Sequence, residues 1–456
     1  MIKIGRLTVK MNFQKVILTF LGIVACYDCL AAEYGIIIDA GSSGSRARIY
    51  TWPERTELTE VIQLREVANK KSKPGLSAFV GDAQGIRNHL SQLIEACKDN
   101  VPEEKRPNTP IYLMATAGMR LLTGTDAFAI YQTVNDLLSH KSFSPFDFTK
   151  GNARTLSGEE EGAFTWISAN QLNGLFGNDR TTNRTVGIME MGGASTQMAF
   201  VPRGSLLADK FPVYVAGKYY PLYVHSYLYY GQDFASKKIK DYIYRMRTDR
   251  DATNFSNPCM LVGDQKTEMI EGTNVQFQGT GQADDCLELI QAELVFKVPD
   301  YRCYPKPCSI GQVYQPVIPA DMIFHAVSAF AFTVKDMNAY SSGESTTAKV
   351  ILATSREFCK MDLETALNKT GNRFVDTLCF SGLFISTLLT DGWGFGEDRK
   401  IDAAGEIADQ ELTWTPGAMV YEVERRDRGH FEPVTATAST QETAIILTVM
   451  LIAAGL

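Results

Sequence analysis

The feature that most constrains the fold is a short stretch that occurs twice with the same pattern. In Gly35–Tyr50, three consecutive isoleucines lead into Asp39, small residues follow, and apolar and polar residues then alternate. The isoleucines are typical of a strand buried on both faces, and the alternation is typical of a second strand with one buried face. Val186–Phe200 repeats this order with Glu190 in place of Asp39. Each stretch predicts a hairpin with a carboxylate and a small-residue tip.

The tips of both hairpins have the composition of phosphate-binding loops. Glycine and serine let backbone N–H groups approach oxygen atoms closely, and serine hydroxyls add further donors. An ordinary Gly/Ser turn would explain one such hairpin equally well, but its recurrence favours phosphate. Facing each other, the hairpins would hold a polyphosphate, with Asp39 and Glu190 directed at a metal ion. The expected phosphate contacts are Ser42, Ser43, Gly44, Ser45 and Arg46, and then Gly192, Gly193, Ala194 and Ser195.

Length and charge limit the class of protein. The chain has 456 residues and a hydrophobic fraction of 45%, which is enough for two domains with cores and too much for a disordered chain. The net charge of -7 argues against a nucleic-acid partner, because binding to a phosphate backbone needs a basic face. An anionic ligand must therefore be met by local donors and a metal ion.

Both ends of the chain carry apolar segments. The run Val16–Cys26 follows scattered basic residues and precedes Ala31 and Ala32, which is the layout of a secretory signal peptide over residues 1–32. Lipid modification of Cys26 would instead leave the protein anchored. Residues 435–456 predict a packed helix or, in a eukaryote, a removable lipid-anchor signal. We expect a secreted or extracytoplasmic protein, for which membrane attachment is allowed but not required.

The cysteines fit an oxidising compartment. Six of the seven that remain after residue 32 lie in the second half of the chain, and in an exported protein we expect them to form disulfides. Other pairings are open in principle, and Cys97 is expected to be a buried free thiol. Zinc is not expected, because the chain lacks paired C-x-x-C spacings. The expected pairs are Cys259–Cys286, Cys303–Cys308 and Cys359–Cys379.

A third segment places polar groups at the end of a strand. Ile111–Ala115 predicts a short strand that ends in Thr116–Arg120, with a helix after it. Such a loop lies at the carboxyl edge of a sheet, where α/β proteins bind ligands. Arg120 either contacts a ligand at this edge or forms a salt bridge at the start of the helix.

A predicted helix after Leu156 opens with three consecutive glutamates. Ser157 and Glu160 have the spacing of a capping box, and the helix dipole favours acidic residues in a first turn. These effects account for Glu159 and Glu160. They do not require Glu161, which is therefore our candidate for chemistry.

Five separated stretches resemble, in content and order, the signature regions of the apyrase family, the ecto-nucleoside triphosphate diphosphohydrolases. The similarity covers about residues 34–420, with two departures: Pro416 stands where the family usually has Leu, and Glu190 where most members have Asp. The five stretches are Ile38–Arg46, Ala115–Arg120, Ser157–Gly162, Glu190–Gln197 and Trp414–Met419.

The resemblance implies an α/β fold with two ribonuclease-H-like domains of the actin and hexokinase type, flanking a nucleotide cleft. The domains would be residues 33–155 with 403–434, and residues 156–402. The resemblance makes Glu161 the general base, with Ser195 and Gln197 positioning the attacking water. Thr116 and Ala117 would contact phosphate, and Asp39 and Glu190 would hold Mg²⁺ or Ca²⁺ largely through its waters.

The resemblance does not supply the aromatic residues that sandwich the base, because the family's tyrosines are absent from residues 328–333. Phe332 or Trp393 would take their place, since a flat aromatic stacks on any base. Ordinary hydrophobic packing is the other interpretation of these side chains.

The function that the resemblance implies is that of a monomeric, divalent-cation-dependent hydrolase of nucleoside tri- and diphosphates. An exopolyphosphatase shares the phosphate clamp but has no need of a base-stacking aromatic. A sugar kinase or an ATP-switched, actin-like binding protein requires cytosolic ATP, against which the signal peptide argues.

Overall fold

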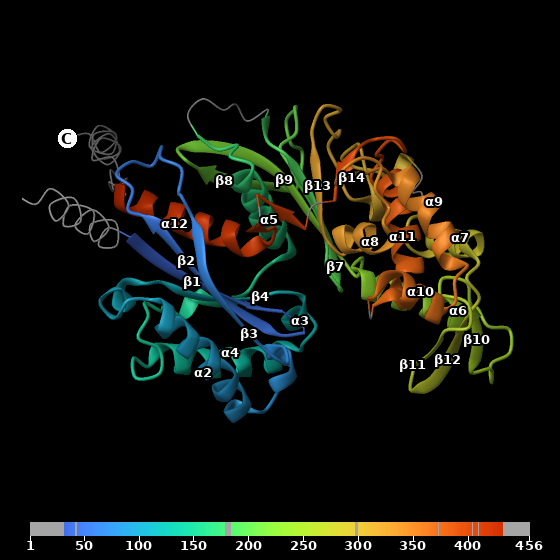
Figure 1. The fold of residues 1–456 in the computed structure, drawn as a ribbon, viewed down its shortest axis with the longest axis horizontal. Coiled ribbons are helices and arrows are strands. Elements are labelled where there is room, and N and C mark those ends of the chain that lie inside the picture. Colours follow the sequence, from blue (N-terminus) through green and yellow to red (C-terminus); the bar gives the residue numbers. More distant parts are fainter. Residues whose placement is uncertain are drawn as a thin grey trace, which may run out of the picture.

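The computed structural model describes residues 32–41, 43–177, 184–296, 300–372, 374–403, 405–408 and 410–431. It has two lobes, each built on a β-sheet, with helices between and outside the sheets (Figure 1). The predicted signal peptide, Cys26, Ser42 and the predicted C-terminal tail lie outside the described residues.

The first lobe is built on a five-stranded sheet with the order β3-β2-β1-β4-β5. β1 and β2 form the predicted antiparallel hairpin, so the prediction from Gly35–Tyr50 is confirmed. β4 and β5 continue the sheet in parallel. The strands are β1 (Ala32–Ala40), β2 (Ser45–Pro53), β3 (Arg65–Ser72), β4 (Ile111–Ala115) and β5 (Ala153–Thr155).

The second lobe is built on a seven-stranded sheet with the order β14-β15-β13-β6-β7-β9-β8. β6 and β7 form the second predicted hairpin. β13 runs parallel to β6 as β4 runs parallel to β1, so the repeat extends to a third strand. The strands are β6 (Gly187–Met191), β7 (Ser195–Phe200), β8 (Lys210–Val215), β9 (Lys218–Leu228), β13 (Phe324–Ser328), β14 (Ser345–Thr346) and β15 (Ile401–Asp402).

The three isoleucines of β1 pack on both faces of the first sheet, as predicted. Ile36 and Ile38 are buried in an apolar cluster with residues of α2 and α4. Ile37 lies in a second cluster, with residues of α5 and α12. The helices are α2 (Ala83–Asn100), α4 (Gly124–Ser139), α5 (Gly158–Leu172) and α12 (Trp414–Phe431).

Helices α5 and α12 lie between the two sheets (Figure 1). The cluster around Ile37 also contains Ile188 and Ala199 from the second sheet, so one apolar layer joins the lobes. The α/β fold with two sheet-based domains is thus confirmed. The domain boundaries near residues 155 and 403 stay a prediction, because α5 and α12 contact both halves.

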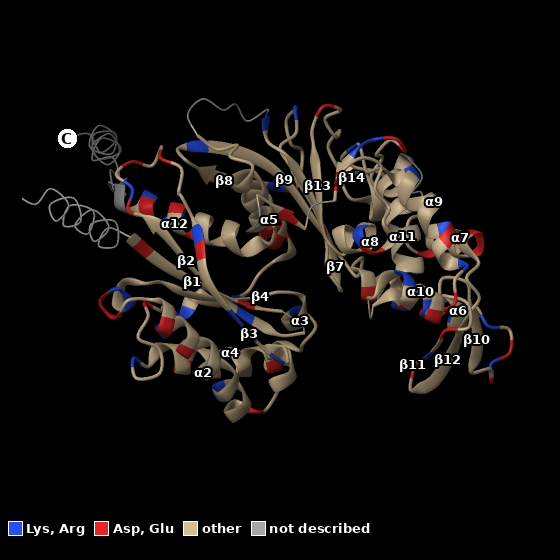
Figure 2. Cartoon of the chain, viewed as in Figure 1, with Lys and Arg blue, Asp and Glu red and all other residues tan. Residues whose placement is uncertain are grey.

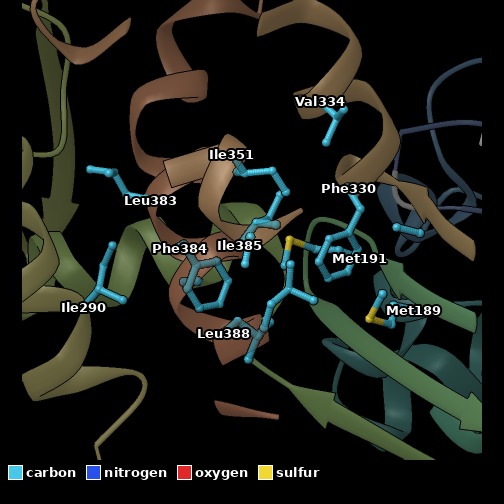
Figure 3. Close-up of a cluster of buried hydrophobic side chains, with 14 of the residues drawn as sticks. Met189, Met191, Ile290, Phe330, Val334, Ile351, Leu383, Phe384, Ile385 and Leu388 are labelled. Carbon is cyan, nitrogen blue, oxygen red and sulfur yellow. The ribbon is translucent and has the colours of Figure 1, made fainter. Parts of the chain in front are cut away.

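The outer face of the second sheet packs on a large apolar cluster. Met189 and Met191 of β6 lie on this side, and Met191 lies near Phe330 (Figure 3). All residues of α11 are buried, which explains why its sequence is mostly apolar and contains no charged residue. The helices here are α8 (Ala329–Met337), α9 (Ala348–Cys359) and α11 (Leu378–Thr387).

The disulfides of the second lobe follow the expected pairing: Cys259–Cys286, Cys303–Cys308 and Cys359–Cys379. Cys97 is free and buried, as predicted. Burial raises the pKa of its thiol to about 12, so little reactive thiolate forms. Three disulfides indicate folding outside the reducing cytosol.

No single helix of the described chain is long and apolar enough to cross a membrane. The bent pair Leu363–Thr370 and Val375–Gly392 passes this test by length and composition only when the two are taken together.

Smaller elements complete the described chain. The helices are α3 (Ala117–Arg120), α6 (Gln232–Arg245), α7 (Ala283–Glu293) and α10 (Leu363–Thr370). The strands are β10 (Asn254–Asn257), β11 (Gln265–Ile270), β12 (Thr273–Gly279), β16 (Glu406–Ile407) and β17 (Gln410–Glu411). Short helical turns span Leu76–Phe79, Glu103–Asn108, Lys150–Asn152, Asp300–Arg302, Ile310–Gln312, Val375–Thr377 and Leu388–Gly392.

Candidate active site

Asp39 and Glu190 occupy equivalent positions in the two hairpins. Asp39 pairs across its hairpin with Arg46, and Glu190 pairs with Gln197. Each carboxylate lies near the carboxyl end of a strand that has a parallel neighbour, β4 or β13. This is the edge of an α/β sheet at which ligands bind.

Three acidic side chains from separate elements lie close enough to affect one another's ionisation. Burial raises the pKa of Asp39 to about 7, and the charge of Glu161 adds to the rise. Burial also raises the pKa of Glu190 to about 8, with further contributions from Glu161 and Asp39. Like charges have such effects only across short distances. Asp39, Glu161 and Glu190 are thus close enough to interact, and Thr165, on the same helix as Glu161, contacts Glu190 directly.

Glu161 is not needed to cap its helix, because its neighbours do so. Ser157 and Glu160 make both hydrogen bonds of the predicted capping box. Arg120 donates through Nη2 to Glu161 Oε2 at 2.5 Å, so it forms a salt bridge, but with α5 and not at the start of the helix α4 that follows it. Burial raises the pKa of Glu161, and the guanidinium of Arg120 opposes that rise. The first lobe thereby favours the ionised form of the candidate base.

Two hydroxyl groups hold the carboxylate of Glu190. Thr165 on α5 donates to Oε2 at 2.6 Å, and Ser328 at the end of β13 donates to Oε1 at 3.4 Å. Ser328 has φ 58° and ψ -126°, a conformation that L-residues adopt rarely and that is often found at functional sites. Glu190 is thus positioned by the helix and by the neighbouring strand.

The carboxylates fit a divalent cation that is bound mainly through water. Asp39 Oδ1 is buried and has no hydrogen-bond partner. Mg²⁺ prefers oxygen ligands and keeps several of its waters, so it needs few direct protein ligands. Within the described part of the chain, no group of three or more His, Cys, Asp or Glu side chains is placed to hold an ion by itself.

The tip of the first hairpin is compact. Gly44 lies against the neighbouring strand, where a Cβ would come within 2.9 Å of the backbone oxygen of Ser72. Ser43 is exposed, and Ser45 is buried with no hydrogen-bond partner for its Oγ. Ser43 therefore offers an accessible hydroxyl to a ligand, whereas the hydroxyl of Ser45 is enclosed.

Arg46, which we expected to contact phosphate, is paired with an acidic residue. Its Nη1 lies 3.0 Å from Glu411 Oε2. Arg48, only 4% exposed, also bonds Glu411 and lies 2.7 Å from Glu66. A phosphate contact by Arg46 therefore requires that Arg46 exchange Glu411 for the ligand.

The tip of the second hairpin is fixed against the start of α6. The backbone N–H groups of Gln232 and Asp233 donate to the carbonyl oxygens of Gly192 and Gly193 at 2.9 and 3.0 Å. A Cβ at Gly193 would come within 2.5 Å of Asp233 Oδ2, so a larger residue there would require the Asp233 side chain to move. In the first lobe, Thr116 N donates to Ala40 O at 3.4 Å, which places Thr116 and Ala117 beside the other tip.

Ser195 and Gln197, the expected water-positioning pair, are hydrogen-bonded to each other. Gln197 Nε2 donates to Ser195 Oγ at 2.8 Å and to Ser226 Oγ at 3.1 Å. Both members of the pair are almost completely buried. Hydrogen bonds and burial thus hold the side-chain amide of Gln197 beside the hydroxyl of Ser195.

The two candidates for base stacking differ in their exposure to solvent. Phe332 on α8 is 60% exposed and is available to a ligand. Trp393 is 2% exposed and packs against Tyr227 and Phe330. Trp393 therefore presents no free face, and the interpretation of this side chain as hydrophobic packing holds.

Three hydroxyl residues of the site were not predicted from the sequence: Thr165, Ser226 and Ser328. Thr165 follows Glu161 by one helical turn, which was the only available signal for it. Ser226 and Ser328 stand in strands far along the chain. Only the sheet register brings them beside Gln197 and Glu190.

Comparison with known proteins shows the family of the chain. The sequence matches the GDA1/CD39 (nucleoside phosphatase) family over residues 29–431. The chain belongs to this family.

Named relatives of this GDA1/CD39 protein are similar over most of their length. It is 31% identical to ectonucleoside triphosphate diphosphohydrolase 8 of Bos taurus over 424 residues, which cover 85% of this chain and 82% of the relative. It is 30% identical to guanosine-diphosphatase of Schizosaccharomyces pombe, with 87% and 75% covered. The crystal structure of nucleoside triphosphate hydrolases from Neospora caninum shares the fold, with a TM-score of 0.65, 16% identity and coverage of 91% and 98%.

Proposed function

We propose that this protein is a divalent-cation-dependent hydrolase that removes terminal phosphates from nucleoside tri- and diphosphates. The observation that carries the proposal is that Asp39 and Glu190, at the ends of two matching hairpins with small-residue tips, both interact electrostatically with Glu161 on α5. The family membership and the names of the relatives support nucleotide substrates of both kinds.

The two tips would bind the phosphate chain. Backbone N–H groups and hydroxyls of residues 43–45, Thr116 and 192–195 supply donors. Asp39 and Glu190 would hold Mg²⁺ or Ca²⁺ through its waters, and the ion would neutralise charge on the phosphate oxygens. Phe332 would stack on the base, a contact that is indifferent to base identity.

Glu161 would take a proton from the attacking water. Ser195 and Gln197 would hold that water in line with the bond to the leaving group. As the water oxygen bonds to the terminal phosphorus, the bond from phosphorus to the bridging oxygen breaks, and inorganic phosphate and the shortened nucleotide leave. No phosphorylated enzyme is formed.

We place the reaction outside the cytosol. The disulfides support an extracytoplasmic or lumenal location.

Lysine and arginine are intermixed with aspartate and glutamate over the described parts of both lobes, which favours a small anionic substrate over nucleic acid (Figure 2).

The experiment that tests this function is phosphate release from a panel of substrates. The panel comprises nucleoside tri-, di- and monophosphates and inorganic polyphosphate, each with Mg²⁺, Ca²⁺ or chelator. We expect release from tri- and diphosphates, none from monophosphates, and loss of activity with chelator. Preferential cleavage of polyphosphate would contradict the proposal in favour of an exopolyphosphatase. Release that occurs only once per protein molecule would favour an ATP-switched binding protein.

A further inference from the structure

We propose that Ser226 is a positioning residue for this hydrolysis, which acts by fixing the side-chain amide of Gln197. The inference rests on the proposed function, in which Gln197 orients the attacking water. Ser226 lies on β9, directly opposite Gln197 on β7 in the antiparallel register. Paired residues of neighbouring strands present their side chains on the same face of the sheet.

The hydrogen bonds of Gln197 determine which end of its amide is left for water. Its Nε2 donates to Ser195 Oγ at 2.8 Å and to Ser226 Oγ at 3.1 Å. A side-chain amide has two N–H donors, so these two bonds use both. The carbonyl oxygen remains as the group that accepts a hydrogen bond from water. Ser226 therefore helps to hold the Nε2 end of the amide in this arrangement.

Helix α5 holds Ser226 in place. A Cβ at Gly158, the first residue of the helix, would come within 1.9 Å of Ser226 Oγ. One turn later, a Cβ at Gly162 would come within 3.2 Å of Gln197 Cβ. The two glycines let the helix lie directly on these side chains. The helix that carries Glu161 thus also covers the amide that orients the water.

The same helix face reaches Glu190. Gly158, Gly162 and Thr165 follow the spacing of one helical stripe, and Thr165 donates to Glu190 Oε2 at 2.6 Å. Beneath this stripe, Glu190, Gln197 and Ser226 form a row across β6, β7 and β9. Ser226 is the outermost member of the row, and its contact is with Gln197 rather than with Glu190.

Removal of the hydroxyl should affect the chemical step more than binding. Ser226→Ala leaves one N–H of the buried amide without its partner, so Gln197 is held in place less firmly. We expect kcat to fall about 3- to 10-fold, which corresponds to the loss of one hydrogen bond, with KM nearly unchanged. If Ser226 had only a packing role, its replacement would change thermal stability but would not lower kcat while KM stays nearly unchanged.

The test is a double-mutant cycle of Ser226→Ala and Gln197→Ala, with phosphate release from a nucleoside triphosphate as the readout. Ser386→Ala is the matched control, because Ser386 is a buried serine that donates to a backbone oxygen, that of Leu383 at 2.9 Å. We expect the control to keep the wild-type kcat. We expect the double variant to be no slower than Gln197→Ala alone, because Ser226 acts only through Gln197.

Two results would overturn the inference: a wild-type kcat for folded Ser226→Ala, or effects of the two substitutions that multiply. Should the alanine variant not fold, the same cycle is measured with Ser226→Gly, which also lacks the hydroxyl. Failure of the proposed function looks different, because the wild-type protein would then release no phosphate at all.

Discussion

The guanidinium of Arg120 and the carboxylate of Glu161 lie 2.5 Å apart, and this ion pair joins α3 of the first lobe to α5. Glu161 is subject to opposing effects. Burial raises its pKa, whereas the positive charge of Arg120 lowers it. A general base must be ionised at the working pH, so the first lobe controls the candidate base of the reaction.

Replacement of Arg120 by glutamine should therefore change the pH profile. Without the guanidinium, the pKa of Glu161 rises, and the acid limb of the kcat profile moves to higher pH. The loss of activity should be larger at about pH 6 than at about pH 9. Arg154→Gln is the matched control, because Arg154 pairs with the capping residue Glu160 at 2.8 Å. An equal loss at every pH would show that Arg120 does not act through the ionisation of Glu161.

The metal-free protein should lose stability as the pH rises. The pKa values of Asp39 and Glu190 are raised from 3.8 and 4.5 to about 7 and about 8. Between about pH 4 and about pH 8, the unfolded chain has released these protons while the folded chain still binds them. The free energy of unfolding therefore falls as the pH rises through this range. Melting temperature in chelator should fall across this range, and Mg²⁺ should raise it more at the alkaline end.

Asp39→Asn provides the check on this pH effect. The amide cannot ionise, so the variant should melt higher than the wild type at about pH 8 in chelator and should respond less to Mg²⁺. The contrary result would be identical pH dependence in the two proteins. It would mean that the ionisation of Asp39 does not destabilise the metal-free protein.

The sequence was sufficient to predict the elements that repeat or that are purely local. The hairpins follow from strand periodicity before Asp39 and Glu190, and the helix start at Ser157 follows from its capping box. These features depend on neighbours in the chain.

Contacts set by the tertiary structure could not be predicted in this way. Arg46 was expected at phosphate, but its pairing with Glu411 joins residues that are 365 positions apart. Hydrophobic packing was one of two interpretations of Trp393, but the sequence could not show that its partner is Tyr227. Ser226 reaches Gln197 only through the register of β7 and β9.

Shortening Glu190 should weaken the response to metal. Its carboxylate accepts a hydrogen bond from Thr165 at 2.6 Å, and Glu190→Asp would have to give up either that bond or its reach towards the cation. We expect the Mg²⁺ concentration for half-maximal activity to rise about 10-fold. Thr165→Val should shift it in the same direction. An unchanged metal response in both variants would argue against Glu190 as a metal-binding residue.

Release of Arg46 from Glu411 should favour substrate binding. In Glu411→Gln the ion pair at 3.0 Å is lost, and Arg46 can then contact phosphate without competition. We expect KM for the nucleotide to fall about 2- to 5-fold with little change in kcat. Glu66→Gln is the matched control, since Glu66 pairs with Arg48 at 2.7 Å. Equal changes of KM in the two variants would contradict a role for Arg46 at phosphate.

The most direct test of the central claim compares Glu161→Gln with Glu159→Gln from the same helical turn, with phosphate release and nucleotide binding measured on both. We predict that Glu161→Gln loses about 10²- to 10⁴-fold in turnover but still binds the nucleotide with its metal ion, while Glu159→Gln behaves as the wild type. Near-normal turnover of Glu161→Gln would contradict the assignment of Glu161 as the base and, with it, the mechanism built on the two hairpins.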